Sequence, residues 1–333
     1  MATYFIRRLF WLFPVLLTVS LVTFVIMRSA PGGPWDTDAD RRQVDASTLK
    51  SLEAYYGLNK PLWRQFTAYV FGDVNDQSGK FVCGMVCGNL GPSYRQRGRT
   101  VQDILFAAPP QQSFWQSRFG YSLRLGLSAL SFAIIFGIPI GMITALKQNT
   151  LWDYIGLFIA TSGISVPSFV LAIFLIIIFG TWLHWIDIIV DNWNEIKYWI
   201  MPATVLGFGT MAFTARLTRS AMLEVLRQDY VRTARSKGLS ERVVVIRHML
   251  KNALIPVVTI LGPALAGLVT GSFVIETMFS FPGMGRAYVQ AIGQRDYSMI
   301  MGTTVVYALL VAVANLSVDL IYVFIDPRIR LEE

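Results

Sequence analysis

Six long apolar segments constrain the fold of this chain more than any other feature of its sequence. None of them contains Asp, Glu, Lys or Arg, and they cover residues 10–27, 125–146, 154–183, 199–215, 253–275 and 297–318. A helix needs about 20 mostly apolar residues to cross a bilayer, because lipid offers an open backbone no hydrogen-bond partner. The sequence therefore predicts an all-α integral membrane protein with six transmembrane helices. The segment 154–183 is predicted to be one span that tilts or extends past the bilayer.

The composition agrees with a chain that is surrounded by lipid. Charged residues make up 15% of the 333 positions, against about 25% in soluble domains. The formal net charge of +8 would suggest a nucleic-acid partner in a soluble protein. In a membrane protein, however, Lys and Arg collect on the cytoplasmic loops. We therefore expect contact with membrane lipid and no nucleic acid.

The distribution of Lys and Arg predicts the orientation. With a cytoplasmic N-terminus, the inside segments carry 14 of them: two before the first span, Lys147, nine in residues 216–251, and two after the last span. The short outside loops carry three, Lys197, Arg286 and Arg295. The long segment after the first span is left out, because long translocated loops escape the positive-inside rule. Both termini are therefore predicted to be cytoplasmic.

Three regions follow from this topology. Residues 1–28 form an N-terminal anchor span, which is not a cleaved signal because its apolar run is too long and Arg28 follows it. Residues 29–124 form an external loop region, in which residues 47–56 have a helical apolar rhythm. Residues 125–333 form a core of five spans, with a cytoplasmic loop at 216–252.

The two cysteines of the chain, Cys83 and Cys87, lie in the predicted external region. An oxidising exterior favours a disulfide between them. Two free thiols, or half of a zinc site, are the alternatives. A bridge between residues so close in sequence would hold a local turn rather than stabilise a fold.

Motifs for catalysis are absent from the sequence. It has no GxxxxGK[ST] nucleotide-binding loop and no HExxH zinc motif, and its histidines are His184 and His248. We therefore expect no catalytic residue, metal site or cofactor on this chain. If ATP and magnesium take part in the function, they are expected on other chains.

The loop between the fourth and fifth spans is predicted to contain a short helix beside the membrane. Asp229 is a favoured N-cap and Gly238 a favoured C-cap, while Arg235 and Lys237 fall in the last turn, where the helix dipole favours cations. A helix of about two turns is too short to be stable alone in water. We therefore expect it to be docked on another surface. A second helix is predicted to begin at Ser240 and run towards the fifth span.

The run Arg232-Thr-Ala-Arg-Ser-Lys-Gly238 resembles the EAA loop of binding-protein-dependent ABC importer permeases. Arg232-Thr233-Ala234 stands in place of the family's Glu-Ala-Ala, and Gly238 lies further from Pro256 than in the general pattern. Both departures resemble the dipeptide/oligopeptide/nickel branch. Other segments resemble loop motifs of that branch: Pro31-Gly-Gly-Pro34, Gly57-Leu-Asn-Lys-Pro61, Gly88-Asn-Leu-Gly91, Arg216-Leu-Thr-Arg219, Phe279-Ser-Phe-Pro-Gly283, Arg295-Asp-Tyr297 and Asp326-Pro-Arg328. The resemblance covers nearly the whole chain and is to the first permease subunit. Residues 73–87 look like an insertion.

The resemblance implies a function and partners. It implies a permease subunit of an ABC importer that moves peptides across the cytoplasmic (inner) membrane by alternating access. A second homologous permease subunit, two ABC ATPase subunits and an extracytoplasmic substrate-binding protein are the implied partners. Import of nickel, oligosaccharide or antimicrobial peptide is the alternative within the family, and a stand-alone secondary transporter or a membrane scaffold is the alternative outside it. The residues expected to couple to the ATPase are Asp229, Tyr230, Arg232, Thr233, Ala234, Lys237 and Gly238. Arg216 and Arg219 are expected to be topology anchors first and ATPase contacts second.

Two acidic residues at the ends of spans permit two interpretations. Glu276 and Asp319 could line the translocation path, because a carboxylate in a membrane is a functional candidate by default. Hydrogen bonding between packed helices is the alternative. Gly137-Ile-Pro-Ile-Gly141 is predicted to serve close packing and a mild kink rather than a gate, and Pro167 in the third span has the same two interpretations.

Overall fold

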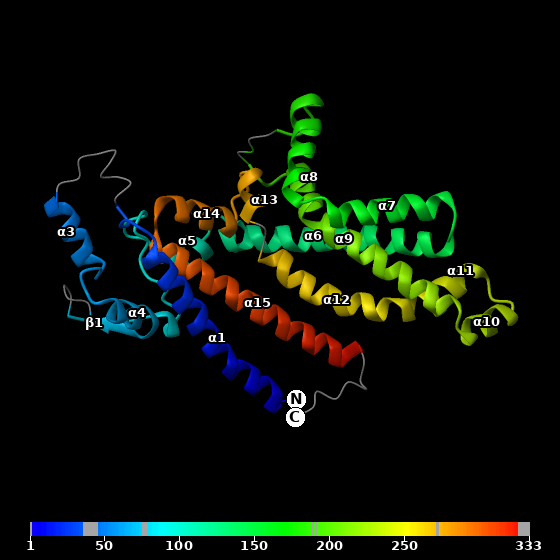
Figure 1. The fold of residues 1–333 in the computed structure, drawn as a ribbon, viewed down its shortest axis with the longest axis horizontal. Helices are drawn as coiled ribbons and strands as arrows, with labels where there is room; N and C mark the ends of the chain where they lie inside the picture. The colour runs from blue at the N-terminus through cyan, green and yellow to red at the C-terminus, as the bar shows by residue number, and fades with distance from the viewer. Residues whose placement is uncertain are drawn as a thin grey trace. The chain divides into compact units, whose positions relative to one another are not determined.

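The computed structural model describes residues 2–35, 46–74, 79–187, 190, 192–270 and 273–325 (Figure 1). The chain forms two compact units, each described by itself below. Unit 1 is built from residues 1–121 and 282–312, and unit 2 from residues 122–281 and 313–332. Two long helices, α6 (Arg118–Leu146) and α15 (Tyr297–Ile325), contribute residues to both units.

Five helical segments in the described part of the chain are long and apolar enough to cross a membrane. They are α1 (Ala2–Ser29), α6, α9 (Ile196–Leu226), the run Glu241–Val269 and α15. The run Glu241–Val269 consists of α11 (Glu241–Val243), the π-helix η4 (Val244–Leu250) and α12 (Lys251–Val269). These segments confirm the prediction of an all-α membrane protein. The predicted fifth span, 253–275, ends early, and Phe273–Met278 forms the separate short helix α13.

The third predicted span is bent far more than expected. Instead of one tilted helix over 154–183, the structure has α7 (Leu151–Ser165) and α8 (Ser168–Leu175), with the chain turning by 109° between them. A residue before proline is driven towards extended backbone, and Val166 has φ −85° and ψ 120°. Pro167 then starts α8, which continues as the π-helix η3 (Ile176–Trp182). The bent pair is a sixth candidate span if it crosses the membrane as one unit.

In unit 2, α9 makes close contacts with α6 and α7. At Gly141 of α6, an added Cβ would lie 2.4 Å from the carbonyl oxygen of Ala215 in α9. At Gly163 of α7, an added Cβ would lie 2.5 Å from the Cβ of Ala212. Small residues allow membrane helices to approach in this way, and the resulting van der Waals contact holds them together. The close approach at Gly141 agrees with the prediction that the Gly137–Gly141 segment serves close packing.

Unit 1 contains most of the region predicted to be external. Besides α1 and parts of α6 and α15, its elements are α3 (Ala46–Tyr55), α4 (Leu62–Phe71), β1 (Gly72–Val74), β2 (Phe81–Cys83), the 3-10 helix η1 (Met85–Cys87), α5 (Val101–Phe106), the 3-10 helix η2 (Phe114–Gln116) and α14 (Met284–Gln294). The predicted helical rhythm at 47–56 is confirmed by α3. Strands β1 and β2 pair antiparallel, with Asp73 opposite Val82. One apolar core includes Val70 of α4, Leu105 of α5 and Met284 of α14, so this region shares its core with residues 282–312.

Candidate functional site

The short helix predicted between the fourth and fifth spans is α10 (Asp229–Ser236). Its N-cap is Gln228, with φ −75° and ψ 145°, and not Asp229 as the residue type suggested. Asp229 is the first helical residue, and its carboxylate is stabilised there by the positive end of the helix dipole. Gly238 follows the helix with φ +76°, and its N–H donates to the carbonyl oxygen of Arg235 at 2.9 Å. The expectation of a left-handed glycine at the C-terminal end is confirmed.

The inner face of α10 packs on its own chain. Val231 is 0% and Ala234 is 5% exposed, and both lie in one apolar cluster with Met222 of α9 and with Val244 and Met249 of η4. Ala234, expected at the surface for the ATPase, is therefore enclosed by this chain. The reason is the three-residue spacing of Val231 and Ala234, which puts both on one face of the helix. Packing on this apolar cluster stabilises α10, which would be too short to be stable alone in water.

Two polar contacts fix the ends of α10. The Tyr230 hydroxyl accepts a hydrogen bond from Nδ2 of Asn252 in α12 at 2.9 Å. Arg235 donates from Nη2 and Nε to the two carboxylate oxygens of Glu241, at 2.6 and 3.1 Å. The hydrogen bonds to Glu241 raise the pKa of Arg235 above its usual value. Neither pair was predictable from the sequence, because residue types alone do not show which surface polar groups meet after the chain turns at Gly238.

The outer face of α10 is exposed and mainly cationic. The exposed residues of α10 are Asp229, Tyr230, Arg232, Thr233, Arg235 and Ser236, and Lys237, directly after the helix, is also exposed. The hydroxyls of Thr233 and Ser236 donate to backbone carbonyl oxygens one turn earlier, each at 3.0 Å. These two side chains are small, their hydroxyls are already hydrogen-bonded, and they lie between the basic side chains. In Figure 1, α10 lies past the end of α9, at the tip of unit 2. A groove with acidic groups on a partner protein would complement this face.

A buried ion pair joins α7 to α9. Arg219 donates from Nε and Nη2 to the two oxygens of Asp153, both at 2.8 Å, and the Asp153 side chain is only 2% exposed. The same carboxylate accepts the backbone N–H of Asn149 at 2.9 Å. Arg219, expected to be a topology anchor or an ATPase contact, therefore has an intramolecular partner, while Arg216 is exposed. A bidentate buried pair of this kind fixes the orientation of both helices.

The two acidic candidates for the translocation path lie in different helices, α13 and α15. Glu276 of α13 is 0% exposed, and it accepts a hydrogen bond from Oγ of Ser122 in α6 at 2.7 Å. This placement favours the interpretation of hydrogen bonding between packed helices. Asp319 lies in α15, but its side chain is outside the described part of the structure.

In unit 1, Asp296 joins several of the short motifs found in the sequence. Its carboxylate, 3% exposed, accepts hydrogen bonds from the Ser93 hydroxyl and from the backbone N–H groups of Tyr94 and Met299. The neighbouring Tyr297 hydroxyl donates to the carbonyl oxygen of Gly32 at 3.1 Å. The segments around residues 31–34, 88–91 and 295–297 therefore come together in one unit. The motifs are recognisable one by one in the sequence, which carries no signal that they lie close together.

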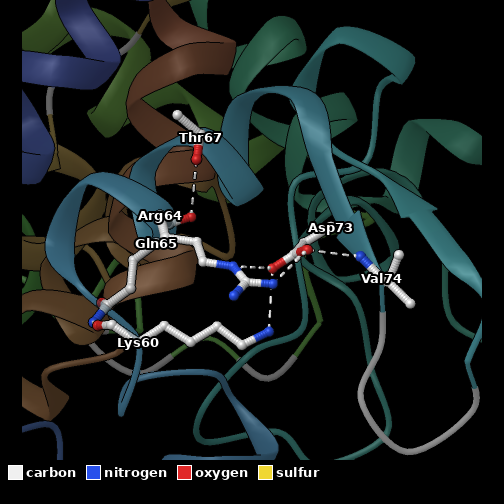
Figure 2. Close-up of polar contacts among 6 residues, drawn as sticks. All are labelled: Lys60, Arg64, Gln65, Thr67, Asp73 and Val74. Atoms are coloured by element: carbon white, nitrogen blue, oxygen red, sulfur yellow. Dashed lines mark hydrogen bonds and ion pairs between the residues drawn. The ribbon is translucent and has the colours of Figure 1, made fainter.

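A surface cluster lies beside this network. Figure 2 shows Lys60 and Arg64 converging on the carboxylate of Asp73 in β1, with N–O distances of 3.1 and 3.2 Å. The hydrogen bonds from Arg64 and Lys60 lower the pKa of Asp73 to about 2. Strand β1 is paired with β2, whose Cys83 is joined by a disulfide to Cys87 of η1.

Comparison with known proteins finds relatives over the whole length of the chain. Residues 137–331 match the family described as "Binding-protein-dependent transport system inner membrane component", and residues 1–114 match its N-terminal family. The dipeptide transport system permease protein DppB of Bacillus subtilis is 39% identical, over 100% of this chain and 99% of its own. The oligopeptide transport system permease protein OppB of Escherichia coli is 36% identical, over 99% of this chain and 100% of its own.

Proposed function

Since this chain belongs to the family of binding-protein-dependent transport system inner membrane components, we propose that it is a permease subunit of an ABC importer for peptides. The dipeptide and oligopeptide permeases that resemble it along its full length favour peptides over the other cargoes of the branch. The observation that carries the proposal is the outer face of α10, which is exposed and cationic although the helix itself is held by its own chain.

In this function the chain makes no covalent change to its cargo. ATP and magnesium bind to two ABC ATPase subunits, and an extracytoplasmic binding protein delivers the peptide. A second permease subunit completes the translocation path, which lies between the two permeases. Both termini and α10 face the cytoplasm, in agreement with the Lys and Arg distribution. Alternating access then requires two arrangements of the spans whose equilibrium the ATPases shift.

The contacts of α10 provide a route by which an ATPase moves the spans. Val231 and Ala234 pack on α9 and η4, Arg235 holds Glu241, and Tyr230 holds Asn252. A displacement of α10 is therefore passed to α9 and to Glu241–Val269 together. The Asp153–Arg219 pair extends the rigid connection to α7.

The test places charge on the outer face of α10 without disturbing its inner face. Arg232→Glu and Thr233→Glu change residues that face solvent, and Thr233→Ser is the matched control. The chain is reconstituted in liposomes with the second permease, the ATPases and the binding protein. We expect both Glu variants to insert and fold, to hold the ATPases less tightly, and to lose peptide uptake and peptide-stimulated ATP hydrolysis.

Full peptide uptake coupled to ATP hydrolysis in both Glu variants would exclude α10 from energy coupling. A wild-type transporter that couples ATP hydrolysis to another cargo, and takes up neither dipeptides nor oligopeptides, would retain the permease role and refute the peptide cargo.

A further inference from the structure

Unit 1 contains a cavity of about 340 Å³ at the end of α1. This volume lies at the lower end of the range for small-molecule sites. Most of its wall is aromatic or aliphatic, and it includes Phe24, Tyr55, Tyr56, Tyr94 and Tyr297. The charged groups on the wall are two cations, Arg28 and Lys60, and one carboxylate, Asp73. The wall therefore carries an excess of one positive charge.

The polar groups on one side of the cavity are already used. Asp73 is held by Lys60 and Arg64 (Figure 2). Both N–H groups of the Gln65 amide are engaged, since Nε2 donates to the carbonyl oxygens of Leu58 and Lys60 at 2.9 and 2.6 Å. On this side of the wall, the Asp73 carboxylate and the N–H groups of the Gln65 amide already have hydrogen-bond partners.

Arg28 differs from these groups. Its Nη2 donates to Oε1 of Gln65, and its guanidinium lies over the rings of Phe24 and Tyr297, at 5.5 and 5.3 Å from their centroids. No carboxylate pairs with it within the part of the chain that the structure describes. Its Nε is buried and has no hydrogen-bond partner among the described residues. A buried guanidinium N–H without an acceptor is unfavourable, so its presence calls for an explanation.

Tyr69 of α4 also lines the cavity, and it holds a second buried donor that is not used. Its hydroxyl is buried and has no hydrogen-bond partner among the described residues. Burial raises the pKa of this hydroxyl, so it stays protonated and can donate. Two unused donors, one of them cationic, on the wall of a largely aromatic cavity match a ligand with one negative group and one apolar group.

We propose that this cavity binds a small carboxylate that also carries an aromatic or aliphatic group, with Arg28 and Tyr69 contacting the carboxylate. The guanidinium provides the charge, and the tyrosine hydroxyl adds a neutral hydrogen bond. The tyrosine rings receive the apolar part. The free C-terminus of a short peptide and a simple arylalkyl acid both have this chemistry. The choice of a peptide probe rests on the proposed function, whereas the acid probe does not.

The binding test uses the full chain in lipid nanodiscs, with empty nanodiscs as background. Fluorine NMR line broadening reports binding of three probes, each with a fluorinated phenyl ring: the dipeptide Ala-Phe, its C-terminal amide, and phenylpropionate. We expect Ala-Phe and phenylpropionate to bind and the amide to bind at least tenfold more weakly. If phenylpropionate bound and Ala-Phe did not, the ligand of this cavity would be a carboxylate other than a peptide. The proposed carboxylate site would then stand. Equal binding of Ala-Phe and its amide, or no binding of either acid at millimolar concentration, would refute the site.

Three variants separate binding from folding. Tyr69→Phe removes one oxygen that has no partner, so we expect unchanged or higher thermal stability together with about 10-fold or greater loss of affinity, the effect of one hydrogen bond to a charged group. Arg28→Gln is expected to reduce affinity by about 100-fold, since the charge is lost as well. Arg99→Gln, an exposed residue outside the cavity wall, is the charge-matched control. Wild-type affinity in a folded Tyr69→Phe protein would overturn the assignment, whatever the Arg28 variant does.

Discussion

The docking of α10 on its own chain makes a specific prediction for the pair Ala234→Asp and Thr233→Asp. The two substitutions are adjacent in sequence and introduce the same charge. Ala234 is 5% exposed and faces the apolar cluster with Val231, whereas Thr233 faces solvent. We therefore expect Ala234→Asp to detach the helix from the chain and Thr233→Asp to leave it docked.

Whether the helix detaches or the new charge stays buried depends on two free energies, that of docking α10 and that of burying a carboxylate. Complete burial of Val231 stabilises docking by about 1.5–3 kcal/mol, and the methyl group of Ala234 adds about 0.8 kcal/mol. The Arg235–Glu241 pair is 40% and 59% exposed, so it contributes about 0.2–1 kcal/mol. The total docking free energy is thus on the order of 3–5 kcal/mol. Burying an unpaired carboxylate costs more than this, so release of the helix is the lower-energy response. The exposed Thr233→Asp change is expected to stay within about 0.5 kcal/mol.

Hydrogen exchange followed by mass spectrometry measures this directly. Peptides covering 229–243 should lose protection by about a hundredfold or more in Ala234→Asp, and trypsin should cut after Arg232 or Arg235 much faster. Both signals should remain close to wild type in Thr233→Asp. Equal protection in the two variants would show that the inner face of α10 is not what holds it, and the route from this helix to the spans would lose its basis.

Three further predictions concern the topology, the disulfide and the ion pairs of Asp73. In a background without native cysteines, a membrane-impermeant reagent added to intact cells should label a cysteine at Lys50 and spare one at Thr233; the reverse pattern would invert the topology. Alkylation without reductant should leave Cys83 and Cys87 unmodified in mass spectra of the wild-type protein, and quantitative labelling of both would disprove the disulfide. Asp73→Asn should lower stability by about 1 kcal/mol near neutral pH. Because the folded pKa of Asp73, about 2, lies below the ordinary value of 3.8, this difference should shrink as the pH falls from about 4 to about 2; a difference independent of pH would contradict the ion pair.

The spans were predictable because their apolar, charge-free composition identifies them. The candidate site was predictable only in part. Charge-free apolar runs of bilayer length locate the spans, since lipid selects for both properties together. The bend at Pro167 was not predictable, because proline in a membrane helix is compatible with a mild kink as well as with a full break. Gly238 indicated the end of α10 through its backbone requirement. The enclosure of Ala234 and the partner of Arg219 depend on which helices are neighbours, and local sequence does not encode that.

The sharp bend between α7 and α8 raises the question whether the chain crosses the membrane an even or an odd number of times. Each arm has 15 residues, a length of about 22 Å, so neither arm alone spans a hydrocarbon core of about 30 Å. If the pair returned to the side it came from, the chain would cross an odd number of times, and α10 would share a side with the loop after α1. The inside segments would then hold six Lys and Arg, at positions 7, 8, 147, 197, 286 and 295, against eleven outside. That distribution reverses the usual excess on the cytoplasmic side. An even number of crossings, with 14 of these residues inside and three outside, agrees better with that rule, so the charges predict that the bent pair reaches the far side.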